Sequence, residues 1–154
     1  MPRRKIRLIE TRMVSEWIAK VYPGAKKIIR VWLGPVGESA VLARAGVTPK
    51  VLMPFGGGWA DALILGPNWT RIVEACVILD TRHVGALEGY MDLFAKTAEY
   101  RDRWDMETIG TLLYGYPRTV AMEMATRKGY ETIRYAPAFI RAYYHEKAGI
   151  VPGR

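Results

Sequence analysis

Two carboxylates stand alone inside apolar stretches of this 154-residue sequence, and they limit what the chain can fold into. Asp61 lies in WADALIL, directly after three glycines, and Glu74 lies in VEACVIL. Such stretches are typical of buried β-strands, and an ionised carboxylate is costly to bury unless hydrogen bonds or a cation stabilise it. We expect the two acids to lie on neighbouring strands and to hold a divalent metal ion together.

Simpler explanations of these residues remain open on the sequence alone. Asp61 could be a solvent-exposed acid at the end of a strand, because it follows the glycines at 56–58. Glu74 could form an ion pair with Arg71 or with a basic helix. Cys76, two residues after Glu74, is most simply a small core residue.

The periodicity of the chain predicts an α/β fold. Helices are expected over 6–21, 83–100, 118–128 and 137–147, with a short one over 38–45. Residues 46–54 should form a loop, or a strand broken by Pro49. Strands are expected over 27–33, 59–65, 71–79, 108–114 and 132–135. The turn at 66–68 favours an antiparallel hairpin, and the later alternation of strand and helix favours parallel pairing. We therefore predict one domain over residues 1–154, with a mixed β-sheet flanked by helices on both faces.

The positive charge of the chain is concentrated near its start. The net charge is +8, and nine of the 23 Lys and Arg residues lie in residues 1–33, where Glu10 and Glu16 are the only acids. Such a cluster attracts polyanions through counterion release, although a solvated basic face would look the same. We expect nucleic acid, and DNA in particular, to be the partner. The residues expected to contact it are Arg3, Arg4, Lys5, Arg7, Arg12, Lys26, Lys27 and Arg82.

Composition also predicts an intracellular, cytoplasmic protein. No apolar run approaches the ~20 residues that span a bilayer. The basic start MPRRKIRLIETR has no apolar segment behind it, as a secretory signal would. A single cysteine excludes an internal disulfide and fits a reducing compartment.

The order of elements and the two acids resemble the PD-(D/E)XK nuclease superfamily, which has the restriction-endonuclease-like fold. The resemblance covers roughly residues 10–137 and rests on WADALIL and VEACVIL for the acids, VGALEGYMDLFAKT for the following helix, and LLYGYPRTVAMEMATRKGYETIRYAP for the late strand, helix and strand. It implies a phosphodiesterase dependent on Mg²⁺ or Mn²⁺, in which Asp61 and Glu74 are catalytic metal ligands. The backbone carbonyl of residue 75 or Cys76 would join them, and Glu16 on the first helix would be an outer or second-metal ligand.

The sequence departs from that family at one decisive position. The family carries a lysine two residues after the second acid, where this chain has Cys76. A thiol is a weak donor without positive charge, and burial near carboxylates keeps it neutral. A cation from elsewhere would have to compensate. Lys20, one turn after Glu16, is our first choice for this catalytic role, with Arg82 and Lys96 as alternatives.

Two functions therefore remain open. The chain is either an active endonuclease or a degenerate, non-catalytic relative that binds nucleic acid or serves assembly in a larger nucleoprotein or viral complex.

Overall fold

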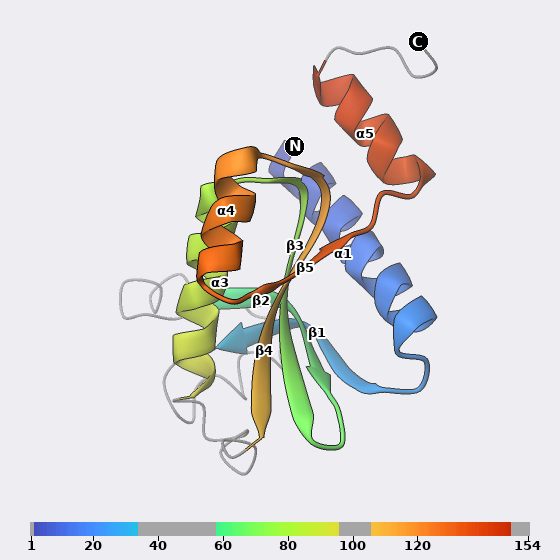
Figure 1. Cartoon of the computed structure of the whole chain (residues 1–154). Coiled ribbons are helices and arrows are strands. Elements are labelled where there is room, and N and C mark those ends of the chain that lie inside the picture. Colours follow the sequence, from blue (N-terminus) through green and yellow to red (C-terminus); the bar gives the residue numbers. More distant parts are fainter. Residues whose placement is uncertain (1, 34–57, 96–105, 149–154) are drawn as a thin grey trace.

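The computed structural model describes residues 2–33, 58–95 and 106–148 (Figure 1). The predicted helix over 38–45 and loop over 46–54 lie outside these residues. In chain order the described elements are α1 (Pro2–Val21), β1 (Lys26–Leu33), β2 (Gly58–Leu65), β3 (Trp69–Leu79), α3 (Thr81–Phe94), β4 (Glu107–Pro117), α4 (Thr119–Arg127), β5 (Glu131–Arg134) and α5 (Ala138–Ala148). None of the described helices is long and apolar enough to cross a membrane.

The five strands form one mixed sheet in the order β1-β2-β3-β4-β5. β1, β2 and β3 pair antiparallel, and β3, β4 and β5 pair parallel. The turn at 66–68 joins β2 and β3 into the predicted hairpin, closed by the bond from the Gly66 N–H to the Trp69 carbonyl at 2.9 Å. The predicted α/β class, with its mixed sheet, is confirmed.

Each face of the sheet buries its own apolar cluster. On one side α3 and α4 cover a cluster that includes Leu63, Ile72, Cys76 and Leu112. On the other side α1 and α5 cover a cluster that includes Ala75 and Leu113 (Figure 1). β3 and β4 contribute to both clusters because their side chains alternate between two covered faces. The sheet is therefore flanked by helices on both faces, as the sequence predicts.

Local signals set the ends of the helices. Asp80 accepts the Thr81 N–H through its side chain at 2.8 Å, and the Asp80 N–H donates to His83 Nδ1 at 3.0 Å, which begins α3 with a reciprocal cap. Gly129, with a φ of +75°, follows α4 and lets the chain reverse. The helix predicted over 83–100 instead begins at Thr81 and ends at Phe94, and α1 begins at Pro2 rather than residue 6.

Two glycines give opposite predictions for stability. At Gly85 in α3 nothing lies within 4 Å of an added Cβ, so Gly85→Ala should raise the free energy of unfolding by about 0.5–1 kcal/mol. At Gly115 in β4 an added Cβ would lie 2.9 Å from the Val77 carbonyl oxygen and 2.8 Å from Ile140 Cγ2. Gly115→Ala should therefore lower the free energy of unfolding by about 1–3 kcal/mol. Urea denaturation of both variants checks the pair, and equal effects would contradict this packing.

Candidate active site

The site begins where β2 and β3 separate. Their pairing runs from Leu65 opposite Thr70 to Ala62 opposite Val73, which places Asp61 and Glu74 opposite each other at its end. There the Asp61 side chain takes over from the backbone, because its Oδ2 accepts the Ala75 N–H at 2.7 Å. β3 continues alongside β4 to Leu79. The carboxylate thus satisfies a β3 donor at the point where β2 leaves it.

The carboxyl groups of Asp61 and Glu74 contact each other in this gap. Their residues are only 7% and 9% exposed, and a side-chain hydrogen bond joins them. Burial raises the pKa of Glu74 well above its ordinary value, and the Asp61 carboxylate raises it further. Asp61 is therefore not an exposed strand-end acid. Glu74 does not pair with Arg71, whose guanidinium instead binds Glu131 through two bonds of 3.0 and 3.2 Å.

A third acid, Glu10 of α1, lies close enough to the pair for the three charges to influence one another. Burial raises the pKa of Glu10 to about 8, and the charge of Asp61 contributes to that rise. The charge of Glu10 in turn raises the pKa of Glu74. The sequence does carry a signal for this residue, because Glu10 lies four residues after Ile6 and three before Met13, on the apolar stripe of the helix.

The two helix residues expected at the site lie elsewhere. Glu16 pairs with Arg12 at 3.5 Å, and its side chain is 40% exposed. The Lys20 ammonium lies 5.4 Å from the centre of the Tyr135 ring. Neither is among the strongest charge influences on Glu10 or Glu74. Within the described residues, the helix acid that the structure brings to the pair is Glu10.

Cys76 is a core residue, as its simplest interpretation holds. It is 1% exposed and its thiol lies 3.8 Å from the Leu113 carbonyl oxygen. Burial, followed by the charge of Glu74, raises the pKa of this thiol far above the neutral range. Cys76 therefore stays uncharged and leaves the site without the cation that a lysine there would supply.

Arginines from two other elements bring positive charge to the acids. Arg30 of β1 lowers the pKa of both Glu10 and Glu74, and Arg82 in the first turn of α3 lowers that of Glu10. Arg30 has a φ of +57°, the left-handed region that costs a non-glycine residue about 1–2 kcal/mol. Of the cations expected to compensate for Cys76, Arg82 is at the site, and Lys96 lies outside the described residues.

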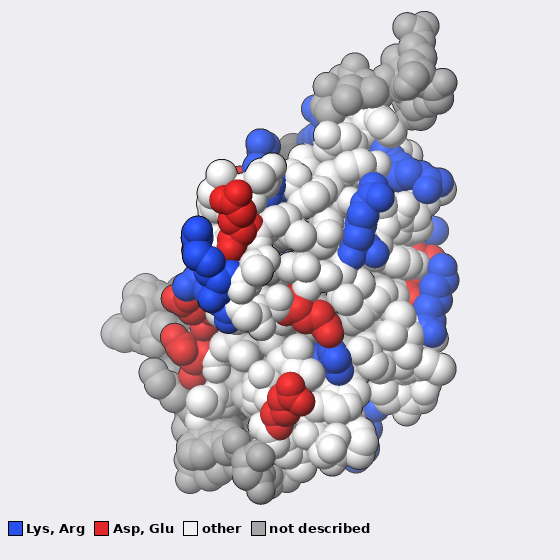
Figure 2. All heavy atoms as spheres, in the orientation of Figure 1, with Lys and Arg blue, Asp and Glu red and all other residues white. Residues whose placement is uncertain are grey.

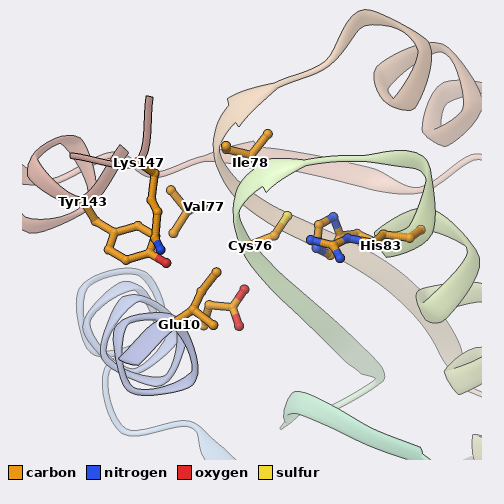
Figure 3. Close-up of a pocket in the computed structure, with 9 residues that line it drawn as sticks. Glu10, Cys76, Val77, Ile78, His83, Tyr143 and Lys147 are labelled. Atoms are coloured by element: carbon orange, nitrogen blue, oxygen red, sulfur yellow. The ribbon is translucent and has the colours of Figure 1, made fainter. Parts of the chain in front are cut away.

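A cavity of about 420 Å³, lined by Glu10 and Cys76, lies between α1, β3, α3 and α5. Figure 3 shows the Glu10 carboxylate directed into it, with Tyr143 and Lys147 from α5 on one side and Cys76 and His83 on the other. Arg82 also lines it. Burial, reinforced by the neighbouring Arg82, lowers the pKa of His83, so its ring is neutral at pH 7. The cavity thus combines an apolar floor with acidic and basic groups at its rim, which is typical of a ligand site.

The carboxylates of the site determine which kind of metal ion could bind there. In residues 2–33, 58–95 and 106–148, no group of three or more His, Cys, Asp or Glu side chains is arranged to hold a metal ion. Mg²⁺, however, is commonly bound through one or two carboxylates and keeps several waters. Asp61 and Glu74 supply two hard oxygen ligands, and a cation would relieve the unfavourable ionisation of Glu74. The residues present fit a partly hydrated Mg²⁺ or Mn²⁺, and not a complete protein cage.

The predicted basic patch is divided by ion pairs. Lys5 binds Glu146 at 3.1 Å, and Arg12, besides pairing with Glu16, lies 3.9 Å from the Phe139 ring centre. On the face in Figure 2, basic and acidic side chains are interspersed. Lys26 and Lys27 pair with Leu65 and Ile64, next to the turn that joins β2 and β3. Arg7 lowers the pKa of Glu10. The side chains of Arg3 and Arg4 lie outside the described part.

Two solved structures share this fold. One is described as a crystal structure of a repair endonuclease from Pyrococcus abyssi, with a TM-score of 0.52 and 15% identity. The other is described as the structure of an EndoMS–dsDNA2 complex, with a TM-score of 0.51 and 17% identity. Each match covers 82% of this chain but only 46% and 44% of those chains. No family model and no curated protein matches the sequence.

These matches establish the fold. The mixed sheet with helices on both faces is shared with these structures, and the predicted restriction-endonuclease-like fold class is confirmed. The chain spans less than half the length of either structure.

The raised pKa of Glu10 predicts how stability depends on pH in metal-free protein. With a folded pKa of about 8 against an ordinary 4.5, the folded state holds this proton longer, so stability should fall as pH rises from about 4.5 to 8. Glu10→Gln removes that loss. Its stability relative to wild type should increase across the window, on the order of a few kcal/mol at pH 8. Urea denaturation in EDTA at several pH values measures this, and parallel profiles would contradict the buried, charge-repelled position of Glu10.

Proposed function

We propose that this chain is a DNA-acting, metal-dependent nuclease of the PD-(D/E)XK type. The observation that carries the proposal is the contact between the buried Asp61 and Glu74 carboxyls at the separation of β2 and β3. Two further facts support it. One structural neighbour is described as a repair endonuclease and the other as an EndoMS–dsDNA2 complex, and this chain has a net charge of +8.

In the proposed mechanism Asp61 and Glu74 hold Mg²⁺ or Mn²⁺, joined by the backbone carbonyl of residue 75 or Cys76. The metal would withdraw charge from a phosphate and lower the pKa of bound water. Asp61 is held in place by the Ala75 N–H, which donates to its Oδ2. The Glu10 carboxyl has a pKa of about 8, so it is largely protonated at pH 7. It faces the cavity, where it can orient water. Arg82 and Lys147 give that cavity its cationic rim.

The second candidate is a non-catalytic subunit that binds DNA or takes part in a larger nucleoprotein or viral assembly. The observation that favours it is the neutral, buried Cys76 where a lysine is expected. On that proposal the pair of carboxyl groups has no catalytic role. The two candidates agree on DNA binding and differ on cleavage.

Conservative substitutions of the acid pair test the nuclease proposal. Asp61→Asn keeps an oxygen acceptor for the Ala75 N–H, and Glu74→Gln keeps a donor to Asp61, so both variants should fold. Each removes one negative ligand, and cleavage of DNA in Mg²⁺ or Mn²⁺ should fall roughly 10²–10⁴-fold, because the metal contributes several kcal/mol to the transition state. Single- and double-stranded oligonucleotides, analysed on gels, measure this.

The controls separate the two candidates. Calorimetric titration with Mn²⁺ should show binding to wild type that both variants weaken. Cleavage that survives both substitutions would refute the proposed mechanism. Wild-type protein that binds DNA and Mn²⁺ without cleaving would favour the non-catalytic candidate.

A matched pair on α1 tests which acid belongs to the site. Glu10→Gln should lower cleavage about tenfold or more, since Glu10 shares the electrostatic environment of Asp61 and Glu74. Glu16→Gln should leave the rate within about twofold, because Glu16 is paired with Arg12 and half exposed. If Glu16→Gln instead lowered cleavage more than Glu10→Gln, Glu16 would be the helix acid of the site.

A further inference from the structure

Arg30 lies opposite the first acid of the site. β1 pairs with β2 so that Ile29 faces Ala62 and Val31 faces Ala60, which places Arg30 across from Asp61. Asp61 is the residue whose carboxylate contacts Glu74. The central acid is therefore flanked by Glu74 from β3 and by a guanidinium-bearing residue from β1.

The backbone of Arg30 departs from a regular strand. Among described residues, it is the one non-glycine residue with a positive φ, at +57°. Ile28 packs with the α3 side of the sheet, Ile29 with the α1 side, and Val31 with the α3 side again. A regular strand would return Val31 to the α1 side, so the alternation of faces is interrupted at Arg30. Strained residues of this kind cluster at functional sites, where the surrounding structure holds them in place.

The guanidinium of Arg30 forms no ion pair or side-chain hydrogen bond with any described residue, and it lies over the Trp59 ring, 5.7 Å from the ring centre. In contrast, three other basic residues, Lys5, Arg12 and Arg71, each bind a carboxylate. Arg30 nevertheless favours the ionised forms of Glu10 and Glu74 by lowering the pKa of each, so its charge acts on both acids. A guanidinium presents a planar set of donors that matches phosphate oxygens.

We propose that Arg30 is the phosphate-binding cation of this site and takes the place that Cys76 leaves vacant. The inference rests on the proposed function, because the bound phosphate is that of a DNA strand lying over Asp61 and Glu74. On this proposal, the left-handed backbone at Arg30 and its position opposite Asp61 bring the guanidinium from β1 to the acids of β2 and β3. The cation of the site would thus come from the edge strand β1, whereas a lysine at position 76 would have come from β3.

Four variants test this assignment: Arg30→Met, Arg30→Gly, Arg30→Lys and, as a matched loss of an exposed arginine in α4, Arg127→Met. DNA binding is measured by fluorescence anisotropy on a labelled duplex, at several salt concentrations. Ca²⁺, which also takes oxygen ligands, replaces Mg²⁺, and gels check that the DNA stays intact. Cleavage in Mn²⁺ and thermal unfolding are recorded for every variant.

The expected result separates a phosphate contact from a structural role. Arg30→Met and Arg30→Gly should weaken DNA binding roughly ten- to hundredfold and reduce the salt slope by about 1, whereas Arg30→Lys should keep the slope and Arg127→Met should bind like wild type. Arg30→Gly should unfold at the same or a higher temperature than wild type, because glycine adopts this φ without strain. Unchanged DNA binding in Arg30→Met, or a loss in Arg30→Gly matched by lost stability, would overturn the assignment.

The same experiment keeps the two proposals apart. Wild-type protein that binds DNA but does not cleave it refutes the nuclease and leaves Arg30 to be judged on the binding data. Wild-type cleavage that Arg30→Met retains at full rate, with full affinity, refutes the role of Arg30 and leaves the nuclease. Wild-type protein that does not bind DNA refutes both.

Discussion

The bond from the Ala75 N–H to the Asp61 carboxylate sets the geometry on which the site depends. A β-strand that loses its partner exposes backbone donors, and a buried unpaired N–H destabilises the fold. Here the side chain of the departing strand satisfies the donor, at 2.7 Å, just where β2 and β3 separate. The strands can part without leaving that group unpaired, and the charge of Asp61 at this point acts on Glu10 of α1.

Asp61, Glu74 and Glu10 concentrate negative charge in a place that water reaches poorly. Glu10 and Glu74 both have raised pKa values, and in each case burial is the largest cause, followed for Glu10 by the charge of Asp61 and for Glu74 by its hydrogen bond to Asp61. Such an arrangement weakens the metal-free protein as pH rises. A bound divalent cation would reverse the sign of that effect, because it stabilises the ionised carboxylates directly. The instability of the acids and their suitability for a cation therefore have one origin.

The sequence predicts the strands and the acid pair well because both follow from short-range patterns. Short apolar runs identify β2 and β3, and the three-residue turn between them sets their register, which brings Asp61 and Glu74 opposite each other. The end of α3 at Phe94 was less predictable, because the apolar periodicity continues beyond it. Which acid of the first helix lies nearer the pair was harder to predict, for a related reason. Periodicity places Glu16 and Glu10 on one helix, but only the tertiary packing of α1 reveals which of them turns toward the sheet.

The source of positive charge illustrates what a linear motif cannot convey. A motif of an acid followed two residues later by a lysine works because both side chains point to the same face of one strand. When Cys76 fills that position, charge must come from another strand, and the sequence spacing no longer locates it. Arg30 is 31 residues before Asp61 in the chain but opposite it in the sheet, and its left-handed φ leaves no signature in the neighbouring residues. The antiparallel register of β1 and β2, and not a local pattern, is what brings this guanidinium to the acids.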